Sequence, residues 1–341
     1  MRVLYFRSPA TDYLADSLLH GLRRLLGAAV VDYPKHDLMY CNCPMEFAQT
    51  IHGKGFTLYR LLEDISVDRT QIGPKLQAGY FDLVVIGNIW MSFGALIDWW
   101  PELKATNSVV LDGSDSPQLY PYAGKWLRNP RRWFVPRAHR HFLYFKREWT
   151  SATLRSRYYN CVPEKLAAWL PAPANLRPIS FSIPPEKIVA APADKKKIFA
   201  QHLVDPEAAA RFGGSTQGVF ATEADYYHDL QTSMFAVTTK RSGWDCLRHY
   251  EIAANGCVPC FRDLDHKPAT CAPHGLNRDN CIVYHSVDDL ERQIRSISPA
   301  AYQQLQQNAL TWVRQYATVA VAQRFLQTCG IAFEFKPDGQ S

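Results

Sequence analysis

Residues Met234–Phe261, which read MFAVTTKRSGWDCLRHYEIAANGCVPCF, decide the fold of this chain. A short apolar run opens the stretch and another closes it, and the segment between them has helical rather than alternating spacing. Ser242 and Asp245 form a pair that resembles a capping box, which predicts the helix start. Asn255-Gly256 predicts its end, because glycine adopts the left-handed cap readily. The stretch therefore predicts a strand, a loop, a helix, a turn and a second strand.

A basic loop leads into the expected helix. It carries Lys240, Arg241 and Gly243 beside a helix start whose free N–H groups and dipole suit an anion, most naturally a phosphate. Arg248 and Glu251 follow on the helix. The loop and the helix start together predict a site for a phosphate-bearing ligand.

One face of the helix is expected to present an aromatic ring, a cation and a carboxylate, because Trp244, Arg248 and Glu251 recur at i, i+4 and i+7. A carboxylate there can accept both hydroxyls of a ribose, and the cations can neutralise a diphosphate. That combination describes a nucleotide-sugar site. The alternative is that Arg248 and Glu251, three residues apart, form only a surface ion pair.

The run from Arg248 to Pro259, RHYEIAANGCVP, resembles the donor-site segment of GT-B glycosyltransferases. It is most similar to the exostosin-like and CgeB-like groups and to the C-terminal donor-binding segment of family 1-like enzymes. In these groups an Arg-x-x-Glu is followed by small residues, Gly-Cys, an aliphatic residue and Pro. The resemblance covers about thirty residues. It implies two Rossmann-like α/β domains that face each other across a cleft, and transfer of a sugar from a nucleoside diphosphate.

The resemblance also implies the site residues. Glu251 would bind the ribose, and the loop would meet the phosphates. A similar aromatic-Lys-Arg-Glu stretch precedes the domain junction of the resembling enzymes, which places Lys146 near the cleft. The expected donor site consists of Lys240, Arg241, Ser242, Gly243, Trp244, Asp245, Arg248, Glu251 and Lys146. Many retaining GT-B enzymes carry a second Glu at the position of Gly243, so its absence favours an inverting reaction.

Composition indicates a soluble globular protein. The chain has 341 residues, 47% of them hydrophobic and 21% charged, which is enough for two domains of ordinary size. No apolar run approaches the roughly 20 residues of a membrane span. The apolar run Met1–Phe6 meets Arg7 and Pro9 too soon for a signal peptide. We therefore expect a cytoplasmic protein, with peripheral contact to the inner face of a membrane as an addition.

Cysteine and glycine patterns argue against a metal and a dinucleotide cofactor. Nine cysteines are an odd number, which is typical of free thiols in a reducing compartment. The spacings of a conceivable zinc set fit no standard finger; this set is Cys257, Cys260, His266, Cys271, His274 and Cys281. Glycine is too sparse after the first strand for an NAD fingerprint. We therefore expect no bound metal ion and no cofactor, and we expect the nucleotide sugar to be the co-substrate.

Strand and helix patterns alternate along the whole chain, as in a doubly wound α/β protein. Expected strands cover residues 1–6, 30–33, 81–87, 108–112, 141–145, 179–185, 195–203, 234–238, 257–261 and 281–285. Expected helices cover residues 12–26, 205–212, 223–233, 288–294, 299–316 and 317–331. Prolines 163, 171, 173 and 178 mark a linker region. The expected domains are residues 1–180 for the acceptor and 181–318 for the donor, with a helix in 319–335 that crosses back to the first.

Two aspartates are candidates for the catalytic base. Asp112 and Asp115 lie just past a strand, at the edge that would face the cleft, and inverting transfer needs a group that takes the proton of the acceptor hydroxyl. Asp-Gly and Ser-Asp are also ordinary turn formers. Asp12 and Glu63 are weaker candidates. The long connection 34–60 either overhangs the cleft and contacts acceptor or is a decoration without contact.

The net charge of +6 and pI near 8.8 suit phosphate-bearing ligands without demanding nucleic acid. The segment Arg128–His141 mixes Arg, His and aromatic residues, which indicates an anionic membrane, a phosphorylated acceptor or a solvated loop. We expect a nucleotide-sugar donor and a carbohydrate or glycoconjugate acceptor as partners. The alternatives are a non-catalytic protein of the same fold that binds a sugar nucleotide or polysaccharide, and a nucleic-acid-binding protein.

Overall fold

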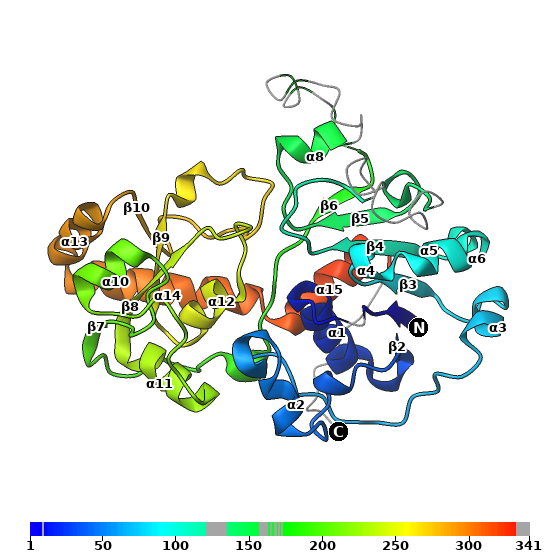
Figure 1. Ribbon diagram of the computed structural model, residues 1–341, viewed down its shortest axis with the longest axis horizontal. Helices are drawn as coiled ribbons and strands as arrows, with labels where there is room; N and C mark the ends of the chain where they lie inside the picture. Colours follow the sequence, from blue (N-terminus) through cyan, green and yellow to red (C-terminus); the bar gives the residue numbers. More distant parts are fainter. Residues whose placement is uncertain are drawn as a thin grey trace.

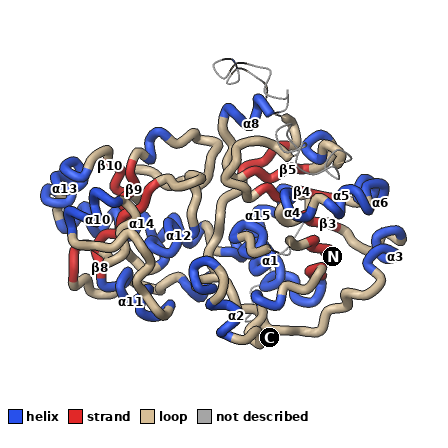
Figure 2. The backbone as a smooth tube through the Cα atoms, viewed as in Figure 1, coloured by secondary structure: helices blue, strands red, loops and turns tan. Residues whose placement is uncertain are grey.

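Two parallel β-sheets form the framework of the chain (Figure 1). The computed structural model describes residues 1–8, 10–120, 135–156, 163, 166, 169, 171 and 173–331. Helices cover both sheets, and the loops that join them are drawn in tan in Figure 2. This arrangement of two Rossmann-like domains confirms the predicted fold class.

The first sheet has six parallel strands in the order β2-β1-β3-β4-β5-β6. Its strands are β1 (Val3–Phe6), β2 (Val30–Tyr33), β3 (Leu83–Ile86), β4 (Ser108–Asp112), β5 (Leu143–Lys146) and β6 (Leu176–Pro178). The strand order reverses between β1 and β3. In open α/β sheets, ligands bind outside the carboxyl ends of the strands near such a reversal.

Both faces of the first sheet are buried. Alternate residues of β1 point to opposite sides, so Val3 and Tyr5 join one apolar cluster while Leu4 and Phe6 join another. The helices of this domain are α1 (Tyr13–Leu26), α2 (Met45–Gln49), α3 (Ile72–Gln77), α4 (Ile89–Ser92), α5 (Gly94–Asp98), α6 (Trp100–Ala105) and α8 (Ser151–Ser156). The near-continuous apolar strands are those of a parallel sheet covered on both sides.

The second sheet has four parallel strands in the order β10-β9-β8-β7. They are β7 (Lys197–Phe199), β8 (Ser233–Thr239), β9 (Val258–Arg262) and β10 (Ile282–Tyr284). The helices of this domain are α10 (Pro206–Phe212), α11 (Glu223–Thr232), α12 (Leu247–Ala254), α13 (Val287–Ser296) and α14 (Pro299–Gln315). The predicted unit of strand, loop, helix, turn and strand is β8, α12 and β9, and Gly256 has the expected positive φ of 64°.

The last described helix, α15 (Thr318–Thr328), packs on α1 of the first domain, as Figure 1 shows for the red and blue helices. The two backbones approach closely at Gly21, where an added Cβ would lie 2.1 Å from the Thr318 carbonyl oxygen. His20 Nδ1 lies 2.8 Å from Thr318 Oγ1. The contact ties the end of the second domain to the first. The exact limits of the domains stay a prediction.

One predicted strand is wrong. Residues 179–185 do not continue the first sheet, which ends at β6, because their backbone groups bind elsewhere. The Phe181 N–H donates to Asp245, and Ile183 pairs with Ala317 in an isolated bridge. The segment therefore connects the two domains instead of extending a sheet.

Three other expectations concern termini, thiols and membranes. Residues 128–134 of the basic-aromatic segment, and the tail from residue 332, lie outside the described residues. The eight cysteines within the described ranges are free thiols. Of the helices described, none combines the length and the apolar character needed to cross a bilayer.

Candidate functional site

A pocket of about 730 Å³ is lined by residues of both domains. The first domain contributes Tyr13, Gly53, Lys54, Phe56 and Asp115, and the second contributes His202, Arg241, Ser242, Gly243, Asp245, Cys246, Leu247, Arg248 and Glu251. Half of these residues come from loops that follow β4, β7 and β8. The pocket thus lies at the carboxyl edges of both sheets, where α/β proteins bind ligands.

The helix beside the pocket begins later than predicted. α12 starts at Leu247 with Cys246 as its cap residue, not at Ser242. The capping box does not form because the Asp245 carboxylate is used elsewhere: Oδ2 accepts from the Phe181 N–H at 2.9 Å and Oδ1 from the Tyr250 hydroxyl at 3.0 Å. Cys246 makes no side-chain capping bond. The start of α12 still faces the pocket, because Cys246 and Leu247 line it.

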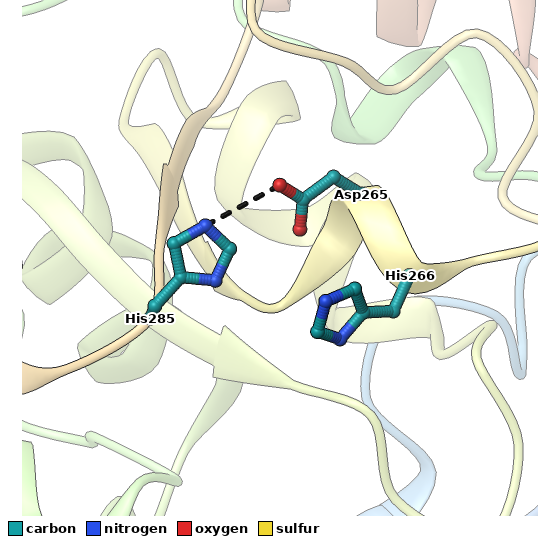
Figure 3. A group of neighbouring side chains, drawn as sticks. All are labelled: Asp265, His266 and His285. Atoms are coloured by element: carbon teal, nitrogen blue, oxygen red, sulfur yellow. Dashed lines mark ion pairs between the residues drawn. The ribbon is translucent and has the colours of Figure 1, made fainter.

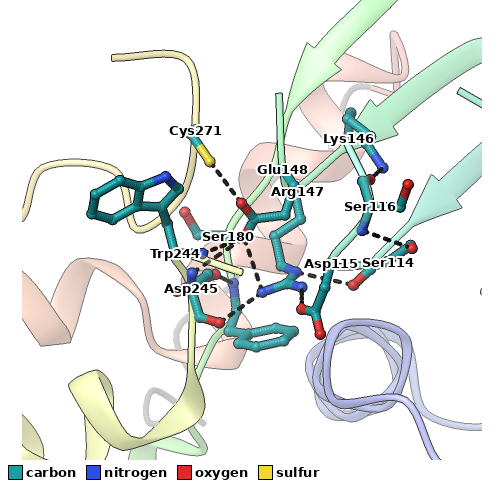
Figure 4. A network of polar contacts seen from close by, with 12 residues as sticks. Ser114, Asp115, Ser116, Lys146, Arg147, Glu148, Ser180, Trp244, Asp245 and Cys271 are labelled. Carbon is teal, nitrogen blue, oxygen red and sulfur yellow. Dashed lines mark hydrogen bonds and ion pairs between the residues drawn. The ribbon is translucent and has the colours of Figure 1, made fainter. Parts of the chain in front are cut away.

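Residues of the first domain hold the loop that precedes α12 (Figure 4). Glu148 Oε1 accepts from the N–H groups of Trp244 at 2.9 Å and Asp245 at 3.2 Å. Arg147 Nη1 donates to the Asp245 carbonyl oxygen at 2.7 Å. Arg147 and Glu148 are both buried. This loop is therefore positioned by the opposite domain, a feature that local sequence patterns cannot reveal.

Two arginines supply positive charge to the pocket. Arg241 is exposed at its rim, and Arg248 projects from the first turn of α12. The Nη1 of Arg248 is buried, and it has no hydrogen-bond partner among the described residues. His202 also lines the pocket, but burial and the nearby Arg248 lower its pKa to about 4, so its imidazole is neutral at pH 7. The unpartnered guanidinium N–H suits a negatively charged ligand.

Glu251 is buried at the pocket wall and does not form the surface ion pair considered as an alternative. Its side chain accepts two hydroxyl donors: Thr57 Oγ1 to Oε1 at 2.5 Å and Tyr226 Oη to Oε2 at 2.8 Å. Burial raises the pKa of Glu251, whereas the Thr57 bond and the charge of Arg248 lower it. A carboxylate has about four lone-pair sites, so two remain for a ligand.

Of the two predicted bases, only Asp115 lines the pocket. Its side chain is 52% exposed and forms an ion pair with Arg147. It lies beside Gly243, where an added Cβ would be 2.9 Å from Asp115 Oδ1 and 2.5 Å from Glu148 Oε1. Position 243 therefore has no space for a side chain, and carboxylates of the first domain lie next to it instead.

Asp112 and Lys146, two of the predicted site residues, do not line the pocket. Both side chains are fully buried in the first domain, where Lys146 Nζ lies 3.0 Å from Asp112 Oδ1. Asp112 also accepts from Trp90 Nε1 at 2.7 Å and from the Tyr144 hydroxyl at 2.5 Å. The two residues are register partners at the ends of β4 and β5, so they neutralise each other inside the domain.

Other predicted residues lie outside the pocket. Trp244 is buried and stacks near Phe261, with the Lys240 ammonium 5.0 Å from the centre of the Trp244 ring. Neither Trp244 nor Lys240 lines the pocket. Asp12 caps α1, and burial and Asp16 raise its pKa to about 6. Trp244, Arg248 and Glu251 thus do not share a face, since Trp244 precedes the helix.

Sequence reasoning missed several lining residues. Lys54 and Phe56 come from the long connection 34–60, whose length was the only signal that it has a function. This connection overhangs the cleft, because its residues Lys54 and Phe56 line the pocket. That it contacts an acceptor stays a prediction. His202 follows β7 without any motif. Thr57 contacts Glu251 across 194 positions of sequence, a distance that no local pattern spans.

A cluster of side chains of the types that bind metal ions lies outside the lining of the pocket (Figure 3). Within the described ranges, Asp265, His266 and His285 are the group of His, Cys, Asp and Glu side chains close enough to share an ion. Both nitrogens of His285 already face carboxylates, Nδ1 toward Asp263 at 2.8 Å and Nε2 toward Asp265 at 3.3 Å. The Asp263 hydrogen bond raises the pKa of His285. Ion pairs therefore explain this exposed cluster, and of the conceivable zinc set only His266 belongs to it.

Comparison with known proteins identifies the fold. No protein-family model and no curated protein sequence matches this chain. HepE of Anabaena in complex with UDP aligns with a TM-score of 0.53 and 10% identity over 97% of this chain and 100% of its own. An alpha-glucosyltransferase in complex with UDP aligns with a TM-score of 0.51 and 9% identity over 96% of this chain and 99% of its own.

At such identities the alignments establish the fold alone, so the narrower exostosin-like or CgeB-like assignment stays a prediction. The alignments extend over nearly the full length of both chains, which means that the pairing of the two domains is shared and not only one sheet. The chain therefore has the GT-B fold of the structures it resembles, with two Rossmann-like domains and a charged pocket between them.

Proposed function

We propose that this chain is a glycosyltransferase that moves a sugar from a nucleoside diphosphate to a hydroxyl of a carbohydrate or glycoconjugate acceptor. The observation that carries the proposal is Arg248, which lines the pocket and whose buried Nη1 has no hydrogen-bond partner in the described chain. A diphosphate would supply the missing acceptor. Glu251 lies one helical turn away and keeps lone pairs for ribose hydroxyls.

The same residues suit the chemistry of transfer. As the sugar leaves, negative charge grows on the diphosphate, and fixed positive groups stabilise it. Arg241, Arg248 and the start of α12 line the pocket, which supports this role for them. We propose that they act without a metal ion, since two guanidinium groups and a helix start provide the field.

We propose an inverting reaction in which Asp115 takes the proton of the acceptor hydroxyl. Gly243 supplies no carboxylate, and Asp115 is the half-exposed carboxylate that reaches the pocket from the acceptor domain. Arg147 holds its position. The support is geometric: a general base must lie within hydrogen-bond reach of the proton that it removes.

Thermal unfolding with a set of nucleotides tests the proposal. UDP is the first probe, because both structural neighbours described above were solved with it. At a concentration 100 times its Kd, a ligand that binds only the folded chain adds about 2.7 kcal/mol of stability. We expect UDP, or another of ADP, GDP and CDP, to raise the Tm by several degrees, and uridine to have little effect. The proposal fails if no diphosphate raises the Tm, or if uridine does so equally.

A further inference from the structure

A strap from the first domain reaches the second domain at the pocket. We use the name for residues 51–60, which follow α2 and lie beside α11, as Figure 1 shows. Lys54, Thr57 and Arg60 all have positive φ values in this strap. Its Lys54 ammonium donates to the Phe220 carbonyl oxygen at 2.8 Å. The strap therefore bridges the two domains by direct hydrogen bonds.

The strap is firmly rooted in the first domain. Leu58 is fully buried in the core, and the Tyr59 hydroxyl donates to Asp16 Oδ2 at 2.8 Å. The Arg60 N–H donates to the Leu38 carbonyl oxygen at 2.8 Å. These contacts immediately follow Thr57, so the position of Thr57 is set by the first domain.

Among the described residues, the hydrogen-bond partners of Thr57 all belong to the second domain. Its N–H donates to Glu223 Oε1 at 2.5 Å, and its hydroxyl lies 2.7 Å from the Tyr227 hydroxyl. The same hydroxyl donates to Glu251 Oε1 at 2.5 Å. A φ of 74° is unfavourable for a β-branched residue, so the surrounding contacts must hold Thr57 in place. Such a conformation is typical of a functional position.

The Thr57 bond determines how Glu251 is oriented. With Tyr226 on the other oxygen, the carboxylate has one donor on each atom and cannot rotate freely. Glu251 nevertheless lines the pocket while the strap is present. The strap therefore does not displace a ligand from Glu251, and it leaves about one acceptor site on each oxygen for the neighbouring hydroxyls of a ribose.

We propose that Thr57 is a positioning residue for the nucleotide, through which the acceptor domain orients the ribose-binding carboxylate of the donor domain. This inference rests on the proposed function. It makes donor affinity depend on a residue that belongs to the opposite domain. It also predicts that the effect of Thr57 is transmitted only through the ribose hydroxyls, since the proposal places the ribose and not the diphosphate on Glu251.

The test is calorimetric titration of the full chain with UDP and with 2′,3′-dideoxy-UDP. Thr57→Val keeps the β-branched shape and removes the hydroxyl, and Thr57→Ser keeps the hydroxyl as the matched control. We expect Thr57→Val to weaken UDP binding about tenfold, on the scale of one hydrogen bond to a charged group. Binding of the dideoxy analogue should stay unchanged, and Thr57→Ser should bind UDP like the unaltered chain.

Each other result overturns the inference. Equal losses for UDP and the dideoxy analogue would mean that Thr57 only maintains the structure. Unchanged UDP affinity would mean that Glu251 needs no help from the strap, and tighter binding would mean that Thr57 competes with the ribose. Failure of the unaltered chain to bind UDP or any other nucleoside diphosphate would refute the proposed function itself, a result distinct from these three.

Discussion

Replacing Arg248 with alanine is expected to weaken UDP binding about 100-fold. Charge-assisted hydrogen bonds contribute about 1.5–3 kcal/mol each, and the buried Nη1 of Arg248 lacks any other partner in the described chain. Its loss should therefore weaken ligand binding, and the internal contact that it removes is that of the guanidinium with the Tyr226 ring, 5.8 Å from the ring centre. Calorimetric titration of both proteins with UDP measures the change.

The matched control is Arg292→Ala. Arg292 lies on α13, its side chain is 74% exposed, and it does not line the pocket. UDP affinity should be unaffected by this change. The UDP affinity of Arg248→Lys should lie between those of Arg292→Ala and Arg248→Ala, because an ammonium group cannot donate the paired hydrogen bonds of a guanidinium. If Arg248→Ala binds UDP normally, the diphosphate lies elsewhere and the proposed orientation of the donor is wrong.

Replacing Asp115 with asparagine is expected to lower turnover at least about 100-fold while UDP affinity stays the same, because a general base acts on the reaction and not on donor binding. The measurement is release of the nucleoside diphosphate from the sugar nucleotide, with water or a sugar as acceptor. The donor is the one whose diphosphate raises the Tm most. Asparagine keeps the shape of Asp115 and a contact to Arg147 but cannot take a proton.

Asp112→Asn is the matched control for this experiment. Asp112 is buried against Lys146, so its loss should destabilise the fold by about 3–5 kcal/mol and lower the Tm. Protein that remains folded should keep its turnover. If Asp115→Asn turns over as fast as the unaltered chain, Asp115 is not the general base. Tight UDP binding with no release of UDP by the unaltered chain would favour the non-catalytic alternative.

The parallel sheets could be predicted because their signals are local. Apolar runs of four to seven residues, helical periodicity and the cap at Gly256 lie within a few positions of each other. These features placed β8, β9 and the end of α12 to within about one residue, but they placed the start of α12 too early. The same locality explains the errors, because Asp245 has the sequence of a capping residue but binds the backbone of Phe181.

The site could be predicted only in part, since its wall is built by two domains. Arg241, Arg248 and Glu251 lie in one continuous segment, and all three line the pocket. Asp112 and Asp115 look alike in sequence, but the side chain of Asp112 meets Lys146 on the neighbouring strand and is buried. Which aspartate reaches the pocket depends on the pairing of β4 with β5. Composition and the spacing of residues do not reveal that strand pairing.

A crystal structure of the chain with UDP is the decisive experiment. We expect the diphosphate to bind between Arg241 and Arg248 at the start of α12, with the ribose hydroxyls on Glu251. UDP bound away from these three side chains, or contacting only one domain, would contradict it.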